Sequence, residues 1–160
     1  MGKKKVSNVG KLLSLVALVA GVAAFIMMFL DAIKITADFG IAKNVTTYKG
    51  SEVAFGLKDK IGSMEVTILN FNLIALITFL LPLAGGVISY LFKNKLFTLI
   101  AFLCFVIGAI ALFAFGPIFA IGLENEINQE YVSLGAGTII AAIFSLIGTA
   151  CVAGKIYLSK

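Results

Sequence analysis

The chain of 160 residues is 61% hydrophobic and 13% charged, and its formal net charge is +5 at pH 7. Soluble globular proteins are about 45–50% apolar and about 25% charged, so this composition excludes an ordinary water-soluble domain and predicts a protein dissolved in a lipid bilayer. The sequence also has no histidine, which removes the commonest metal ligand and the usual general base near neutral pH.

The first predicted element is a membrane span at residues 12–30. A lysine-rich segment precedes it, as in a signal peptide, but the apolar run is 19 residues long. The apolar part of a cleaved signal has about 7–15 residues, whereas 19 residues at about 1.5 Å each nearly cross a hydrocarbon core. We therefore expect an uncleaved first span.

Residues 31–70 form the longest stretch that water would tolerate, and we expect them to lie outside the membrane. Apolar and polar side chains alternate over residues 33–39 and again over 64–68, and residues 52–57 are a shorter candidate strand. The first two continue directly from neighbouring helices, whose axes lie about 8–10 Å apart. We expect them to pair antiparallel with the shorter strand alongside; the alternative is an irregular loop on the lipid headgroups.

The second span is predicted at residues 71–92. Pro82, near its middle, removes one helical hydrogen bond and predicts a kink. Gly85 and Gly86 follow, and small residues of this kind let a neighbouring helix come close. Residues 93–95 are sufficient only for a tight turn.

The third and fourth spans are predicted at residues 96–119 and 134–152, separated by an outer loop at 120–133. The third apolar run is too long for one straight helix in a bilayer, and Pro117 marks either its end or a kink. We favour a bent extension beyond the lipid.

Small residues at four-residue spacing indicate close helix packing. They occupy one face of the fourth span at Gly137, Ala141 and Ser145, and the first span has a similar face at Gly21. Packing inside one bundle explains these faces better than a homodimer seam, although the sequence alone does not separate the two.

The lysines predict the orientation of the chain. With both termini on one side, that side holds eight lysines and no acidic residue, while the other holds five lysines and all eight acidic residues. Lysine excess in short loops marks the cytoplasmic face, so we expect both termini in the cytoplasm and the helices in the plasma membrane. The charge then reflects topology and contact with anionic lipid, and no nucleic-acid partner is expected. The eight lysines are Lys3, Lys4, Lys5, Lys11, Lys93, Lys95, Lys155 and Lys160.

The four predicted spans contain no charged residue. A charge at the bilayer centre costs about 2.5–3.5 kcal/mol and is kept there for a function, so its absence argues against proton-coupled transport and voltage sensing. Cys104 and Cys151 lie in apolar runs and are interpreted as small hydrophobic residues. With no catalytic, phosphate-binding or metal-binding motif, we expect no enzymatic activity, no cofactor and no metal.

Aromatic residues of the outer loops are the candidate contacts to a protein partner or to lipid headgroups. The alternative is that they fill the core of the outer region. They are Phe39, Tyr48, Phe55 and Tyr131.

Two short motifs and the overall layout carry a resemblance. The motifs are Ala54-Phe55-Gly56 in the first outer loop and Leu134-Gly135-Ala136-Gly137 at the start of the fourth span. On these the chain resembles small four-helix membrane proteins of low-GC Gram-positive bacteria, and its layout is similar to that of claudins. Of the claudin loop signature, a tryptophan, Gly-Leu-Trp and two cysteines, only Gly56-Leu57 is present, so barrier function does not carry over.

The resemblance implies an all-α membrane fold: a four-helix transmembrane bundle with a small extracytoplasmic antiparallel β-sheet from the first outer loop. We expect one domain over residues 1–160 that acts as an interaction, assembly or scaffold module. It would present residues 31–70 to a protein partner, a second copy or the lipid bilayer. The alternative is a subunit of an oligomeric transporter or channel, with a pore lined by serine, threonine and backbone.

Overall fold

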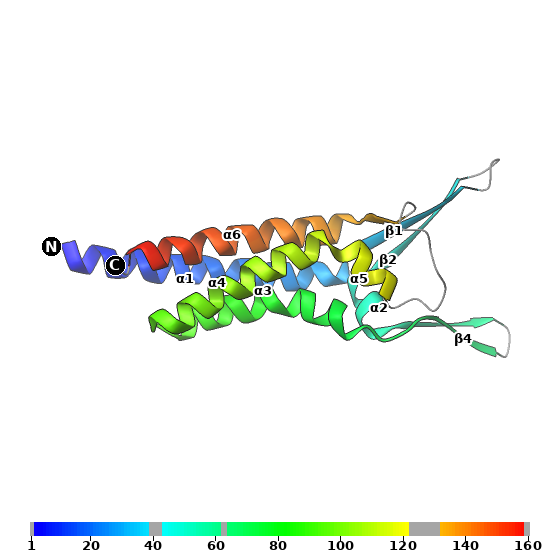
Figure 1. Cartoon of the computed structure of the whole chain (residues 1–160), viewed down its shortest axis with the longest axis horizontal. Coiled ribbons are helices and arrows are strands. Elements are labelled where there is room, and N and C mark those ends of the chain that lie inside the picture. The colour runs from blue at the N-terminus through cyan, green and yellow to red at the C-terminus, as the bar shows by residue number, and fades with distance from the viewer. Residues whose placement is uncertain (1, 39–42, 62–63, 122–131, 159–160) are drawn as a thin grey trace.

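Four long helices run side by side, and a group of strands and short helices covers one end of them (Figure 1). The computed structural model describes residues 2–38, 43–61, 64–121 and 132–158. The long helices are α1 (Gly2–Ile26), α3 (Leu73–Leu91), α4 (Lys95–Phe113) and α6 (Ala136–Leu158). Each contains a stretch long and apolar enough to cross a membrane, which confirms the four predicted spans at this level.

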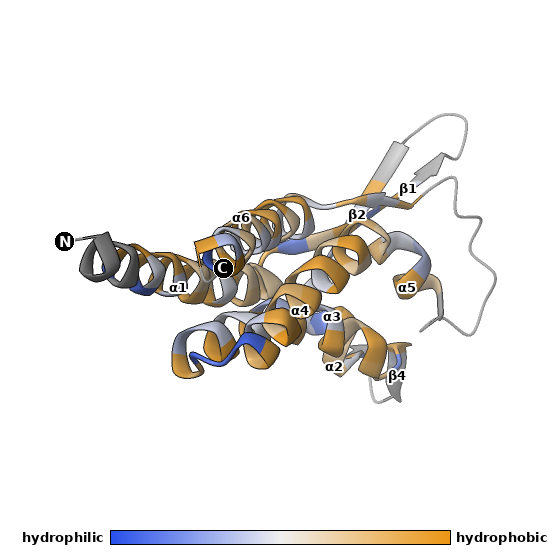
Figure 2. Ribbon diagram, turned by 60° about the vertical axis from the view of Figure 1, so that its left-hand side comes forward, coloured by the Kyte–Doolittle hydropathy of each residue, from blue (hydrophilic) through white to orange (hydrophobic). Residues whose placement is uncertain are grey.

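The helices form a ring in which each has two neighbours. Helix α1 packs against α3 and α6, and α4 packs against the same two helices on the opposite side. Both termini lie at the end of the bundle that also holds the α3–α4 turn, away from the strands (Figure 1). Hydrophobic residues cover most of the length of all four helices (Figure 2).

We call the elements at the other end the cap. It comprises the turn η1 (Met27–Phe29), the short helices α2 (Gly50–Phe55) and α5 (Phe115–Ile121), and five strands. The strands are β1 (Asp31–Asp38), β2 (Lys43–Lys49), β3 (Leu57–Ile61), β4 (Met64–Leu69) and β5 (Val132–Leu134). One antiparallel sheet has the order β2-β1-β5, and β3 and β4 form a separate antiparallel pair.

The predicted pairing within this region is wrong, although strands were correctly expected at both ends of the first outer loop. Strand β1 does not pair with β4: one of its edges is taken by β2 and the other by β5, from the second loop. Strand β4 pairs instead with β3. Both β4 and β5 lead into a neighbour of α1, but Gly135, between β5 and α6, donates its N–H to the Ala32 carbonyl of β1 at 2.7 Å, which places β5 at that edge.

The candidate strand at residues 52–57 is also a wrong prediction, because most of it is helix α2. The Glu52 carboxylate accepts a hydrogen bond from the Lys49 backbone N–H at 2.9 Å, which caps the first turn of this helix. Val53 and Ala54, adjacent in the sequence, are both buried, whereas a strand would send them to opposite faces. Gly56 ends the helix with a φ of 85°, a conformation that favours glycine.

The third apolar run forms two helices, as expected for the predicted bend. Helix α4 ends at Phe113, and α5 starts two residues later, after Ala114. Pro117 has no N–H to bond the Phe113 carbonyl four residues before it, which explains why the break precedes the proline. By contrast, α3 runs from Leu73 to Leu91 through the buried Pro82.

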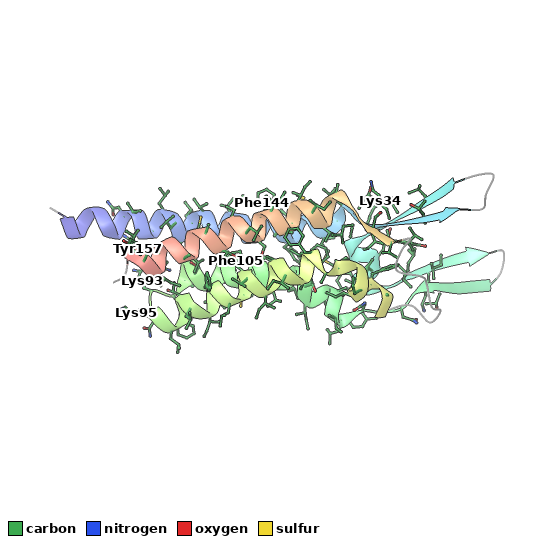
Figure 3. All side chains as sticks on the ribbon, turned by 45° about the horizontal axis from the view of Figure 1, so that its top comes forward. Lys34, Lys93, Lys95, Phe105, Phe144 and Tyr157 are labelled. Atoms are coloured by element: carbon green, nitrogen blue, oxygen red, sulfur yellow. The ribbon has the colours of Figure 1, made fainter. Side chains whose placement is uncertain are left out.

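Small residues set the distance between the helices. A Cβ on Gly21 would overlap the carbonyl oxygen of Pro82, and one on Gly108 would lie 3.0 Å from the Pro82 ring. At Gly148 the place of a Cβ is filled by the ring of Phe105, which lies inside the bundle (Figure 3). The bundle therefore depends on these positions having no side chain.

Replacing Gly148 by alanine should lower the free energy of unfolding. Filling a packed site costs about 1–3 kcal/mol. The matched control is Gly10→Ala, also in a helix, where nothing lies within 4 Å of the new Cβ. Both changes gain about 0.5–1 kcal/mol of helix propensity, so the difference between them isolates the overlap with Phe105.

Unfolding of the purified protein in detergent, followed by circular dichroism, measures this difference. Equal stabilities of Gly148→Ala and Gly10→Ala would contradict the packing described.

Candidate functional site

Asn72 joins three elements at the base of the cap. Its side-chain oxygen accepts a hydrogen bond from Ala75 N–H at 3.0 Å, which caps α3. Its side-chain nitrogen donates to the Ile118 carbonyl of α5 at 2.9 Å, and its backbone N–H donates to the Ala54 carbonyl of α2 at 3.1 Å. The residue is 5% exposed. Helices α2 and α5 are thereby held in fixed positions on top of α3.

A second connection holds the sheet to α6. The Ala32 carbonyl of β1 accepts hydrogen bonds from Gly135 N–H at 2.7 Å and from the Thr138 hydroxyl at 2.9 Å. A Cβ on Gly137 would lie 2.8 Å from the Met27 carbonyl, so α6 starts in direct contact with η1, the turn that follows α1. The strand β1 is thus fixed at its first residues.

Two of the four predicted aromatic contacts, Tyr48 and Phe55, fall within the described residues, and they differ in burial. Phe39 and Tyr131 lie outside the described residues. Tyr48 is half-buried, and its ring stacks on Phe119 with the ring centroids 5.9 Å apart, so it belongs to the core of the cap. Phe55 is 59% exposed.

No pattern in the sequence pointed to a second exposed aromatic residue near Phe55. Phe71 is also 59% exposed, and a Cβ on Gly56, the residue after Phe55, would lie 3.3 Å from the Phe71 nitrogen. The backbone of Phe71, just before α3, therefore lies beside the end of α2, and both aromatic side chains are exposed there without a ring contact between them. We call Phe55 and Phe71 the aromatic pair.

The predicted packing residues lie at contacts between helices of the same chain. Ser145 donates a hydrogen bond to the Phe105 carbonyl of α4 at 2.8 Å, and Ala141 is fully buried. Gly85 faces Phe105 and Ala101 of α4, and Gly86 faces Ala17 of α1. Pro117 is exposed on α5.

Polar groups inside the bundle are mostly bonded to backbone. The hydroxyls of Ser14, Thr78 and Thr98 each donate to the carbonyl four residues earlier. Among the described residues, no fully buried side chain carries a charge, and no group of three or more His, Cys, Asp or Glu is placed to hold a metal ion. Cys104 and Cys151 form no disulfide. This interior offers packing rather than a polar path.

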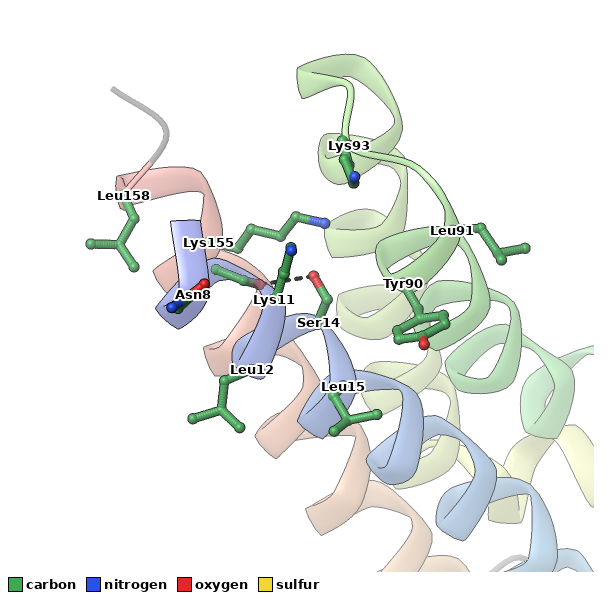
Figure 4. A pocket seen from close by; sticks show the side chains of 11 residues that line it. Asn8, Lys11, Leu12, Ser14, Leu15, Tyr90, Leu91, Lys93, Lys155 and Leu158 are labelled. Atoms are coloured by element: carbon green, nitrogen blue, oxygen red, sulfur yellow. Dashed lines mark hydrogen bonds between the residues drawn. The ribbon is translucent and has the colours of Figure 1, made fainter. Parts of the chain in front are cut away.

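Lysines gather at the opposite end, around a pocket of about 810 Å³. Helix α1 contributes Lys11, the α3–α4 turn contributes Lys93, and α6 contributes Lys155 (Figure 4). We call this the lysine pocket; its lining residues are Asn8, Gly10, Lys11, Leu12, Ser14, Leu15, Tyr90, Leu91, Lys93, Lys155 and Leu158.

Only Lys155 of these three lysines is held by the protein. Its ammonium donates hydrogen bonds to the carbonyls of Ser89 and Phe92, at the end of α3. Cations stabilise a helix C-terminus, where carbonyls have no partner. The other predicted cytoplasmic lysines do not line the pocket. Lys95 is exposed, and Lys3, Lys4 and Lys5 lie in the first turns of α1. Lys160 lies outside the described residues.

Comparison with known proteins gives no match to a family model and no match to a curated protein.

Asn72→Ala should destabilise the cap by about 1–3 kcal/mol, because the change removes a helix cap and leaves the Ile118 carbonyl without its donor. The control is Asn94→Ala: Asn94 also precedes a helix, but its side chain makes no capping bond. Thermal unfolding in detergent, together with limited proteolysis of the cap, measures the effect. If both variants unfold at the same temperature, Asn72 does not have the role assigned to it.

Proposed function

We propose that this chain is a non-enzymatic integral protein of a bacterial plasma membrane, with both termini in the cytoplasm and the cap outside. Large apolar side chains that point away from the bundle support the embedding. Five that are more than half exposed are Leu12, Val19, Leu96, Ile107 and Ile110. In water this surface would be costly, whereas in lipid it needs no cover.

The proposed orientation rests on where the charges lie. Lys93 and Lys95 are at the end with the termini, whereas Lys34 is on the cap (Figure 3). All acidic residues within the described part of the chain belong to the cap; Glu124, Glu126 and Glu130 lie outside it. Lysine excess without acidic residues is typical of cytoplasmic loops.

The proposed activity is that of an interaction or assembly module with a claudin-like architecture. The observation that carries it is the aromatic pair: Phe55 and Phe71 are exposed on elements that Asn72 fixes to the bundle. Backbone that is already held in place loses less conformational entropy when a partner binds. Aromatic residues are also frequent anchors of protein interfaces. Strands from both outer loops at one end of a four-helix bundle support the comparison with claudins.

The alternative, a subunit of an oligomeric transporter or channel, has less support. Serine and threonine would have to line its pore. Of the buried hydroxyls, those of Ser14, Thr78, Thr98, Thr138 and Ser145 already donate to backbone carbonyls.

The orientation predicts the labelling of single cysteines placed in a variant without Cys104 and Cys151. A membrane-impermeant maleimide should label Lys58→Cys, on the cap, in intact bacterial cells. It should label Lys95→Cys only after the cells are permeabilised. Both positions are exposed. The reverse pattern would overturn the proposed orientation.

A photo-crosslinking amino acid at position 55 or 71 should capture a protein, either a partner or a second copy, in intact cells. The control is position 157, because Tyr157 is 77% exposed at the opposite end. Crosslinks identified by mass spectrometry should be specific to the aromatic pair. Capture of lipid alone from positions 55 and 71, or saturable solute flux through liposomes containing the purified protein, would contradict the proposed activity.

A further inference from the structure

We propose that the lysine pocket binds the phosphate group of an anionic phospholipid. The inference rests on the proposed membrane embedding, which places the end with the termini at the headgroup layer. The pocket volume of about 810 Å³ falls in the range of about 300–1,000 Å³ that is usual for ligand sites.

Among the residues that the structure describes, every acidic residue belongs to the cap, at the opposite end from the pocket. The sequence has no aspartate or glutamate at residues 1–30, 66–123 or 131–160, and these ranges contain every segment that forms the pocket. No aspartate or glutamate side chain of these segments therefore neutralises Lys11, Lys93 and Lys155. Three ammonium groups around one cavity attract an anion.

The donors are divided between the protein and the ligand. Lys155 uses two of its three N–H groups on the carbonyls of Ser89 and Phe92, which fixes its ammonium beside the pocket and leaves one donor. Lys11 and Lys93 make no hydrogen bond or ion pair within the described part of the chain, and both are exposed. The Ser14 hydroxyl is bonded to Gly10, so the lysines remain as the donors for a phosphate.

The apolar part of the lining selects a lipid over free phosphate. Leu12, Leu15 and Leu91 line the same pocket as the lysines and are themselves exposed (Figure 4). A phosphodiester that carries acyl chains satisfies both halves of this surface at once, with its phosphate on the lysines and its chains along the leucines. Basic pockets between membrane helices on the cytoplasmic side are typical sites for acidic headgroups.

The test is lipid binding by the full-length protein in nanodiscs, measured by native mass spectrometry. The lipids compared are phosphatidylglycerol and the zwitterionic phosphatidylcholine, with glycerol phosphate and inorganic phosphate as lipid-free competitors. We expect phosphatidylglycerol to bind in preference to phosphatidylcholine, with neither competitor displacing it at equal concentration. Equal binding of both lipids would overturn the proposal, and displacement by either competitor would identify a free phosphate site instead.

Two neighbouring lysines provide the matched variants. Lys93→Gln should lower the affinity for phosphatidylglycerol about fivefold, and Lys11→Gln by a similar factor. Lys95→Gln, two residues further on but outside the pocket, should change it less than about twofold. Equal losses of affinity in Lys93→Gln and Lys95→Gln would indicate general electrostatic attraction to the surface and would overturn the proposed binding site.

The two proposals fail in different ways. A protein that enters nanodiscs but shows no anionic preference contradicts only the lipid site. A protein that does not enter nanodiscs contradicts the proposed embedding, and the lipid site with it. Lys155 is left unchanged in the test because it also caps α3.

Discussion

The cap depends on one buried carbonyl. Ala32, at the start of β1, accepts hydrogen bonds from both the Gly135 N–H and the Thr138 hydroxyl, and these join the end of α1 to the start of α6. A polar group buried beside apolar helices must find its partner in the protein, because leaving it unpaired costs about 1–3 kcal/mol. Satisfying this carbonyl brings β5 to the edge of β1, which fixes the sheet order β2-β1-β5.

Asn72 acts in the same way on the other side of the bundle. Three of its hydrogen bonds hold α2, α3 and α5 together. One polar residue thus connects α3 to two segments that are distant from each other in the sequence. Between these two connections lies an apolar core that includes the edge-to-face pair Phe79 and Phe115, with ring centroids 5.2 Å apart. Apolar packing supplies cohesion there, while the hydrogen bonds of Asn72 and of the Ala32 carbonyl determine the arrangement.

The two ends of the bundle offer different chemistry to their surroundings. The cap exposes Phe55 and Phe71 on a fixed support, which suits a protein surface. The opposite end gathers lysines and leucines around a pocket, which suits the phosphate and acyl chains of a lipid. Between them, five of the described buried hydroxyls donate to backbone carbonyls, whereas the Ser89 hydroxyl has no partner. These features support the proposal of a membrane-held protein that displays its cap to a partner.

The sequence by itself determined the four apolar helices, the strands at both ends of the first outer loop, the break near Pro117 and the separation of lysines from acidic residues. These are local properties, set by run length, alternation, ring chemistry and charge. The tertiary structure decided what distant segments do together: β5 rather than β4 beside β1, α2 in place of a strand, Tyr48 in the core, Phe71 beside Phe55, and three lysines around one pocket. Such contacts depend on which helices are neighbours in the ring, and neighbour relations are not encoded in any one segment.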